Sequence, residues 1–197
     1  VLLHTPDGKK FIEETNKLIQ QINPKSKYLK DRYIIQKAKS LKCELPHQDI
    51  YTSCLEELGS EVYTVYISLT DTDENTGTLF VENIEGKRTE SLGLCGVGCT
   101  SGATCLCSNR SLSLEQIKNY TGQFKTESQH KLIPTSLAAG DCIIFDGFLL
   151  HGTAVNTGDH NRKTMTLTYM IPYDSSKDLV KEYEKYRRKI ISVWSNP

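Results

Sequence analysis

The sequence lacks an excess of either charge, because its 24 lysine and arginine residues are matched by 24 aspartate and glutamate residues. A zero net charge gives no electrostatic reason to expect nucleic acid or an anionic membrane surface as a partner. No apolar run approaches the roughly 20 residues that a membrane-spanning helix needs, so we expect no membrane association. Repeats of fixed period and low-complexity tracts are also missing. The sequence is therefore typical of a single globular domain over residues 1–197.

The sequence contains seven cysteines, and an odd number argues against a complete disulfide framework. A domain of this size can bury a core without covalent cross-links. Together these points predict a reducing, cytoplasmic compartment. Four of the cysteines cluster in a segment at about 82–132: Cys95, Cys99, Cys105 and Cys107. Their spacing leaves three alternatives open, which are a zinc site, disulfides and unligated thiols.

Hydrophobic patterning predicts a mainly β chain with a helix near each end. One face of a helix over residues 6–22 collects apolar side chains: Phe11, Ile12, Leu18, Ile19 and Ile22. A second amphipathic helix is expected over 176–193, and a short one over 113–120. Strands are expected at 33–35, 61–69, 78–81, 142–145 and 164–171. Helices that flank short antiparallel strands indicate a β-sandwich or an open barrel.

Two histidines and one aspartate form a candidate metal site. If residues 45–50 are a strand or its end, His47 and Asp49 face the same side, because side chains two positions apart share a face. His151 follows an apolar segment far downstream and would complete a set of two imidazoles and one carboxylate. This donor set leaves coordination positions open on Fe(II), as an oxygenase that holds a cosubstrate and O2 requires.

Arg162 is a candidate anchor for a dicarboxylate cosubstrate. It lies eleven positions after His151, beyond a turn over 156–161. We expect a hairpin at this turn that returns Arg162 to the side of His151. A guanidinium binds a carboxylate through two parallel hydrogen bonds, so it suits a dicarboxylate whose other end chelates the metal.

The motifs around these residues resemble, in their order and spacing, the phytanoyl-CoA dioxygenase family over residues 33–173. The matching segments are 47–49, 71–79, 140–145 and 151–156, followed by Arg162. The resemblance implies a double-stranded β-helix, or jelly-roll, core of the cupin type with flanking helices. It also implies Fe(II), 2-oxoglutarate and O2 as cofactors, with oxidative decarboxylation of 2-oxoglutarate to succinate and CO2.

The resemblance also assigns roles to individual residues. It gives three catalytic metal ligands: His47, Asp49 and His151. It places Arg162 on the far carboxylate of 2-oxoglutarate, with the hydroxyl of Thr153 assisting. Gln36, a polar residue on the strand before the first histidine, is expected to touch the other end of the cosubstrate. Because Asp49 keeps the carboxylate that halogenating relatives replace, hydroxylation of a small molecule or a side chain is the expected reaction.

One segment departs from the pattern of the family and leaves the substrate open. Many relatives have Pro-Gly-Ser-His after a Gly-x-Leu strand, which corresponds to residues 77–79 here, whereas this chain has residues 80–86, FVENIEG, at that place. The alternatives are a protein or nucleic-acid hydroxylase with 82–132 as a recognition insert, a catalytically inactive jelly-roll binding protein, and a metal hydrolase. The complete triad speaks against the inactive protein, and Arg162 speaks against the hydrolase. Nothing in the sequence indicates the oligomeric state.

Overall fold

The computed structural model describes residues 4–41, 43–49, 59–82, 132–174, 176 and 178–185. Within these residues the chain forms an N-terminal helix, eight strands and a helical stretch over 179–185. The helix and strands are α1 (Pro6–Ile22), β1 (Lys27–Gln36), β2 (Glu44–His47), β3 (Ser60–Ser68), β4 (Leu79–Glu82), β5 (Leu132–Pro134), β6 (Cys142–Asp146), β7 (His151–Thr153) and β8 (Arg162–Pro172). The expected helix over 113–120, the part of the C-terminal helix beyond residue 185 and the four clustered cysteines lie outside the described residues.

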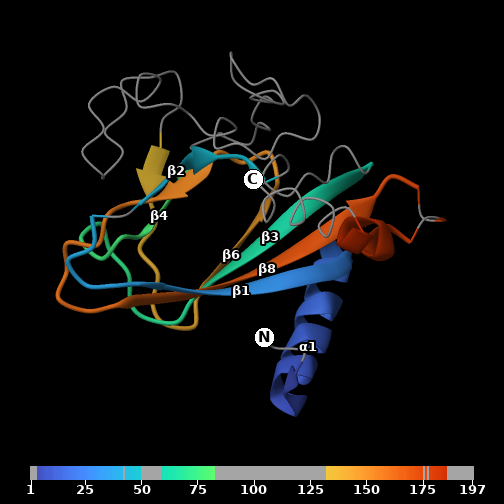
Figure 1. Cartoon of the computed structure of the whole chain (residues 1–197), viewed down its shortest axis with the longest axis horizontal. Coiled ribbons are helices and arrows are strands. Elements are labelled where there is room, and N and C mark those ends of the chain that lie inside the picture. Colours follow the sequence, from blue (N-terminus) through green and yellow to red (C-terminus); the bar gives the residue numbers. More distant parts are fainter. Residues whose placement is uncertain are drawn as a thin grey trace, which may run out of the picture.

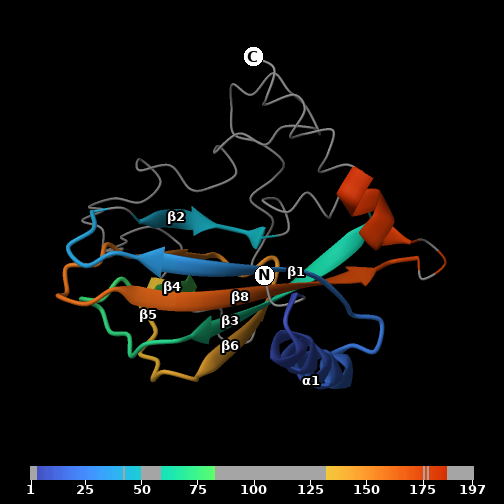
Figure 2. The ribbon, with the colours of Figure 1, turned by 60° about the horizontal axis from the view of Figure 1, so that its bottom comes forward.

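The strands form two four-stranded antiparallel sheets (Figure 1). The large sheet has the strand order β1-β8-β3-β6, and these four strands lie side by side in Figure 2. The small sheet has the order β2-β7-β4-β5. Except for β4 and β5, consecutive strands lie in opposite sheets. This alternation is the topology of a jelly roll, and it confirms the prediction of a mainly β core with helical support. Among the described helices, none has the length and apolar character needed to cross a membrane.

The helix α1 begins and ends where the sequence signals it. The hydroxyl of Thr5 accepts a hydrogen bond of 3.1 Å from the backbone N–H of Gly8, and Pro6 occupies the first turn. Asn23 precedes a proline and has an extended backbone, so the helix stops before it. The predicted bounds of this helix are therefore confirmed.

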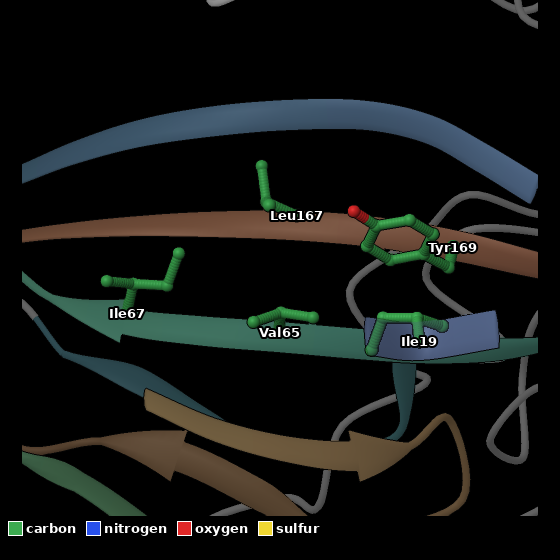
Figure 3. Close-up of a cluster of buried hydrophobic side chains, with 5 residues drawn as sticks. All are labelled: Ile19, Val65, Ile67, Leu167 and Tyr169. Atoms are coloured by element: carbon green, nitrogen blue, oxygen red, sulfur yellow. The ribbon is translucent and has the colours of Figure 1, made fainter. Parts of the chain in front are cut away.

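The helix α1 packs on the face of the large sheet that points away from the small sheet (Figure 1). Ile19 of the helix contacts a buried cluster from β3 and β8 (Figure 3): Val65, Ile67, Leu167 and Tyr169. Burial of each such side chain contributes about 1.5–3 kcal/mol to the free energy of unfolding. This outer core holds the large sheet in place while its other face is left for the pocket.

The buried face of α1 is narrower than the apolar pattern predicts. Ile12 and Ile19 are buried, as predicted, but Phe11, Leu18 and Ile22 are 38%, 46% and 53% exposed. The buried positions are instead Gly8, Ile12, Thr15 and Ile19, which form one line of contact along the helix. Because only this line meets the sheet, the apolar residues at its sides remain at the surface.

Each of the five expected strands corresponds to an observed strand: three lie inside longer strands, and two are shifted by one residue. The expected 33–35 lies inside the ten-residue β1, and 61–69 corresponds to β3 to within one residue. β5 was not predicted, and β7 was expected only as an undelimited strand before the turn at 156–161; each is three residues long. A strand of that length shows too few alternating positions to stand out as a pattern.

The expected hairpin between His151 and Arg162 is wrong, because β7 and β8 lie in opposite sheets. Asn156 fixes the crossing between them. Its side chain is fully buried, and its Nδ2 donates to the carbonyl oxygens of Gln36 (3.3 Å) and His160 (2.9 Å). These bonds satisfy one backbone acceptor at the end of β1 and one within the turn. His151 and Arg162 therefore face each other across the molecule and line one pocket.

Candidate active site

The two histidines of the candidate triad are direct cross-strand neighbours. His47 is the last residue of β2 and His151 the first of β7, and the two are paired in the small sheet. Their ring centroids lie 4.5 Å apart, and both side chains are buried. Residues paired in this way project from the same face of a sheet. The small sheet thus places both imidazoles toward the large sheet.

Asp49 reaches the histidines from beyond the end of the strand. It lies two residues after His47, outside β2. The alternation of side chains along a strand therefore does not explain why it faces the same side as His47. The intervening Gln48 is fully buried and its Nε2 donates to the carbonyl oxygen of Phe148 at 2.7 Å. This bond anchors the segment between His47 and Asp49 to the chain just before β7.

The side-chain atoms of the triad converge. Asp49 Oδ1 lies 3.6 Å from His47 Nε2, and Asp49 Oδ2 lies 3.8 Å from His151 Nε2. The three candidate ligand atoms all lie within 4.8 Å of one another. A single ion bound by three ligands at about 2 Å requires ligand atoms separated by this order of distance.

Hydrogen bonding fixes which nitrogen of His151 can bind a metal. His151 Nδ1 lies 2.9 Å from the carbonyl oxygen of Leu149. A carbonyl oxygen only accepts, so Nδ1 carries the hydrogen and Nε2 presents its lone pair toward Asp49. Burial lowers the pKa of His151, although the charge of Asp49 opposes this effect. A neutral imidazole is the form that binds metals.

The Asp49 carboxylate is held in its ionised form. Burial by itself would raise its pKa, but the neighbouring imidazoles of His151 and His47 bring the pKa well below its usual range. Thr64 of β3 adds a hydrogen bond of 2.5 Å from its hydroxyl to Asp49 Oδ2. Thr64 belongs to the large sheet, so this bond joins the two sheets at the triad.

The donor set fits a first-row divalent metal. Two imidazole nitrogens and one carboxylate oxygen on one side of an ion leave its other side open to the pocket, which is the geometry of non-haem Fe(II) sites. The structure brings His47, Asp49 and His151 together as the sequence predicted. Their binding of iron stays a prediction.

Arg162 lies in the same pocket with an unused donor. Its side chain is buried, and its Nη1 donates to the hydroxyl oxygen of Tyr66 at 2.8 Å. Among the described residues its buried Nε has no hydrogen-bond partner. An unpaired buried donor on a charged group is costly, so the site is complementary to an anionic acceptor. This property fits a carboxylate of a bound cosubstrate.

Tyr66 lies beside Arg162, and the two residues together form an anion site in the pocket. Burial raises the pKa of Tyr66, although the charge of Arg162 works against the shift. The phenol therefore remains protonated at neutral pH. Its oxygen accepts from Arg162, and a protonated phenol can also donate to an anion bound in the pocket.

The other two expected cosubstrate residues are placed differently. Thr153 lines the pocket, but its hydroxyl accepts from the backbone N–H of Glu44 at 3.2 Å rather than contacting Arg162. Gln36 is not among the described residues that line the pocket, and its Nε2 donates to the carbonyl oxygen of Ala154 at 2.8 Å. Contacts of Thr153 and Gln36 with 2-oxoglutarate stay predictions.

Sequence reasoning missed two residues that complete the site, Thr64 and Tyr66. Both lie on the strand expected at 61–69. Alternation along that strand places residues 64 and 66 on one face. The signal that could have identified them is that both side chains carry a hydroxyl group on the same face of the strand.

Two imidazoles and one carboxylate on one side of a metal form the donor set of non-haem Fe(II) oxygenases. The chain belongs to the phytanoyl-CoA dioxygenase (PhyH) family, whose model matches residues 2–164. No curated protein matches the chain significantly in sequence.

Solved structures share the fold at low sequence identity. SnoK, a non-heme alpha ketoglutarate dependent carbocyclase from nogalamycin biosynthesis, is 14% identical with a TM-score of 0.57, and the match covers 86% of this chain and 60% of SnoK. SnoN, an epimerase of the same description and pathway, is 13% identical with a TM-score of 0.56 and coverage of 90% and 63%. AviO1 from Streptomyces viridochromogenes Tue57 is 16% identical with a TM-score of 0.56 and coverage of 86% and 62%. This chain thus spans about three fifths of the length of each of these proteins.

Proposed function

We propose that this chain is an Fe(II)- and 2-oxoglutarate-dependent oxygenase that hydroxylates a small molecule or a side chain. One observation carries the proposal: a single pocket holds two imidazoles, a carboxylate and a buried arginine with an unpaired N–H. Family membership and the fold shared with SnoN and SnoK support it. When bound, Fe(II) and 2-oxoglutarate supply the oxidation of a C–H bond by O2, with release of succinate and CO2.

The small sheet holds the metal. His151 presents its Nε2 because Leu149 fixes the other ring nitrogen, and Asp49 presents an ionised carboxylate. Neither ligand has to lose a proton at neutral pH before the metal binds. The buried imidazoles and their fixed orientation exclude bulk water from one side of the site.

The large sheet orients the cosubstrate. Arg162 and Tyr66 line the pocket with buried side chains, and the Nε of Arg162 has no acceptor among the described residues. In a buried site such charge-assisted hydrogen bonds are stronger than in water. They would hold one carboxylate of 2-oxoglutarate and leave its other end toward the triad.

The fold alone does not determine the outcome of the reaction. SnoN is named an epimerase and SnoK a carbocyclase, so proteins that share this fold catalyse reactions other than hydroxylation. We favour hydroxylation because the carboxylate ligand Asp49 is retained. Product analysis by mass spectrometry with 18O2 separates these outcomes, since only hydroxylation leaves 18O in the product.

The test is anaerobic reconstitution with Fe(II) and 2-oxoglutarate, followed by addition of O2 and measurement of succinate. We expect one iron per chain, 2-oxoglutarate binding that depends on Arg162, and succinate release that a true substrate stimulates. A protein that binds neither iron nor 2-oxoglutarate while remaining folded contradicts the proposal. Hydrolysis of an ester or phosphate probe by the metal-loaded protein without 2-oxoglutarate would favour the hydrolase instead.

A further inference from the structure

Two cations of β1 line the pocket of the triad and are used by neither the metal nor the cosubstrate. Lys30 and Arg32 face the pocket beside the threonines of β8, because Lys30 is paired with Thr168 and Arg32 with Thr166. β1 is the edge strand of the large sheet (Figure 2), so these side chains stand at one side of the pocket.

A β-bulge turns these cations inward. Tyr28 packs on Tyr169 of the outer core, and the register shifts between Tyr28 and Lys30. In a regular strand residues 28 and 30 would share a face, and Lys30 would point to the outer core. The extra residue, Leu29, reverses the alternation and brings Lys30 and Arg32 to the pocket face. Bulges that re-aim side chains are frequent beside active sites.

The cations are not neutralised by the described part of the protein. The guanidinium of Arg32 has no hydrogen bond or ion pair to any described residue. Lys30 Nζ donates to the hydroxyl of Tyr183 at 3.1 Å, a neutral partner that leaves its charge unpaired. The remaining carboxylate that lines the pocket is Glu44, whose Oε1 lies 3.7 Å from His47 Nε2 on the opposite sheet.

The position of these cations separates them from the cosubstrate anchor. Thr166 and Thr168 lie four and six residues after Arg162 on β8, which corresponds to about 13 and 20 Å along the strand. Tyr66 of β3 holds the guanidinium of Arg162, and β3 is two strand spacings, about 10 Å, from β1. One short dicarboxylate that binds both the triad and Arg162 leaves Lys30 and Arg32 for another ligand.

We infer that Lys30 and Arg32 form the recognition site for an anionic group, a carboxylate or a phosphate, of the oxygenase's substrate. This inference rests on the proposed function, because it assigns Asp49 to the metal and Arg162 to the cosubstrate. Thr166 and Thr168 add hydroxyl groups next to the cations, so the same site offers hydrogen bonds to the oxygens of the anion. The substrate would lie across β8 between this site and the triad.

The test compares anions with neutral analogues in a protein loaded with Mn(II) and 2-oxoglutarate. The probes are phenyl phosphate against phenol, and benzoate against benzamide, measured by calorimetry at low ionic strength so that charge effects are not screened. We expect wild-type protein to bind at least one anion more tightly than its neutral analogue. In Lys30→Gln/Arg32→Gln the affinity for that anion should fall about fivefold, while the affinity for the neutral probe stays unchanged.

The matched control is Lys27→Gln/Lys163→Gln, which removes the same charge from exposed residues of β1 and β8 that do not line the pocket. It should bind all probes as wild type does. Because Lys30 also contacts Tyr183, Arg32→Gln alone serves as a second variant that breaks no described contact. A phosphate effect without a benzoate effect identifies a phosphate site, and equal effects identify a site for either anion.

Three results of the anion measurements would overturn the inference: wild type without a preference for an anion, anion affinity unchanged in the pocket variants, or an equal loss in the control. An increase in the 2-oxoglutarate Kd in Lys30→Gln/Arg32→Gln would also overturn it, because the cations would then serve the cosubstrate. Failure of wild type to bind Mn(II) and 2-oxoglutarate contradicts the proposed function instead. The anion comparison is then run on the unloaded protein, and its result decides the recognition site separately.

Discussion

The two sheets contribute to the pocket in different ways. The small sheet supplies its histidines from strands of four and three residues, and the aspartate follows after the strand has ended. The large sheet supplies Arg162, Tyr66 and Thr64 from strands of eleven and nine residues in continuous register. Metal ligands on short elements depend on a few local hydrogen bonds for their orientation. Residues of the large sheet are positioned by the long ladder and by the outer core beneath it.

This comparison predicts that the two halves of the site can be lost separately. The largest expected effect is on the metal. His151→Ala removes one of three ligands, so we expect stoichiometric iron binding and all 2-oxoglutarate turnover to be lost while the large sheet remains folded. Atomic spectroscopy measures the iron content, and circular dichroism shows whether the protein remains folded.

The control for this substitution is His160→Ala, which removes an exposed imidazole outside the triad. It should retain full iron content. If His151→Ala also retains full iron content, the assignment of the triad is wrong.

The next largest effect is expected on the cosubstrate. Arg162→Ala removes a charge-assisted pair worth about 1.5–3 kcal/mol, so the 2-oxoglutarate Kd should rise at least about tenfold with iron content unchanged. Arg162→Lys should recover only part of the affinity, because lysine lacks the planar fork. Calorimetric titration with 2-oxoglutarate checks both variants. An unchanged Kd in Arg162→Ala would show that Arg162 does not bind the cosubstrate.

The contrast between the sheets also explains what could be predicted from the sequence. Long strands of the large sheet have enough alternating positions to be recognised, and the histidines and Arg162 stand in distinctive motifs. The crossing at Asn156 could not be predicted, because a polar turn between two strands looks the same whether the strands pair or separate. Phe11, Leu18 and Ile22 are exposed because of the way α1 lies on the sheet. The local sequence pattern does not contain this information.

The partners of Gln36 and Thr153 illustrate a second limit. Both are polar residues on pocket strands, and either could face a ligand. In the structure, Gln36 donates a hydrogen bond to the carbonyl oxygen of Ala154, and Thr153 accepts one from the backbone N–H of Glu44. Such bonds depend on how the two sheets approach each other, so the residue type alone does not decide between backbone and ligand.

A smaller effect is expected where the large sheet supports the metal ligand. Thr64→Val keeps the shape of the side chain but removes the hydrogen bond to Asp49 Oδ2. Loss of a hydrogen bond to a metal ligand typically weakens metal binding about tenfold or more, so the Kd for Mn(II) should rise by about that factor. Thr166→Val, also in the pocket but without this contact, should leave the Kd for Mn(II) unchanged. Equal values for both variants would show that Asp49 is oriented by the small sheet alone.

The smallest effect is expected for Tyr66→Phe, which separates the two donors of the anion site. The variant removes the hydroxyl that accepts from Arg162 Nη1 and keeps the ring in the core. The variant removes one O–H donor but leaves the positive charge of Arg162 in place, so the 2-oxoglutarate Kd should rise about threefold to tenfold, less than in Arg162→Ala. Because Arg162 would also lose its only described acceptor, a double variant Tyr66→Phe/Arg162→Ala should be less than additive. Strict additivity in calorimetric titrations would mean that Tyr66 and Arg162 act on the cosubstrate independently.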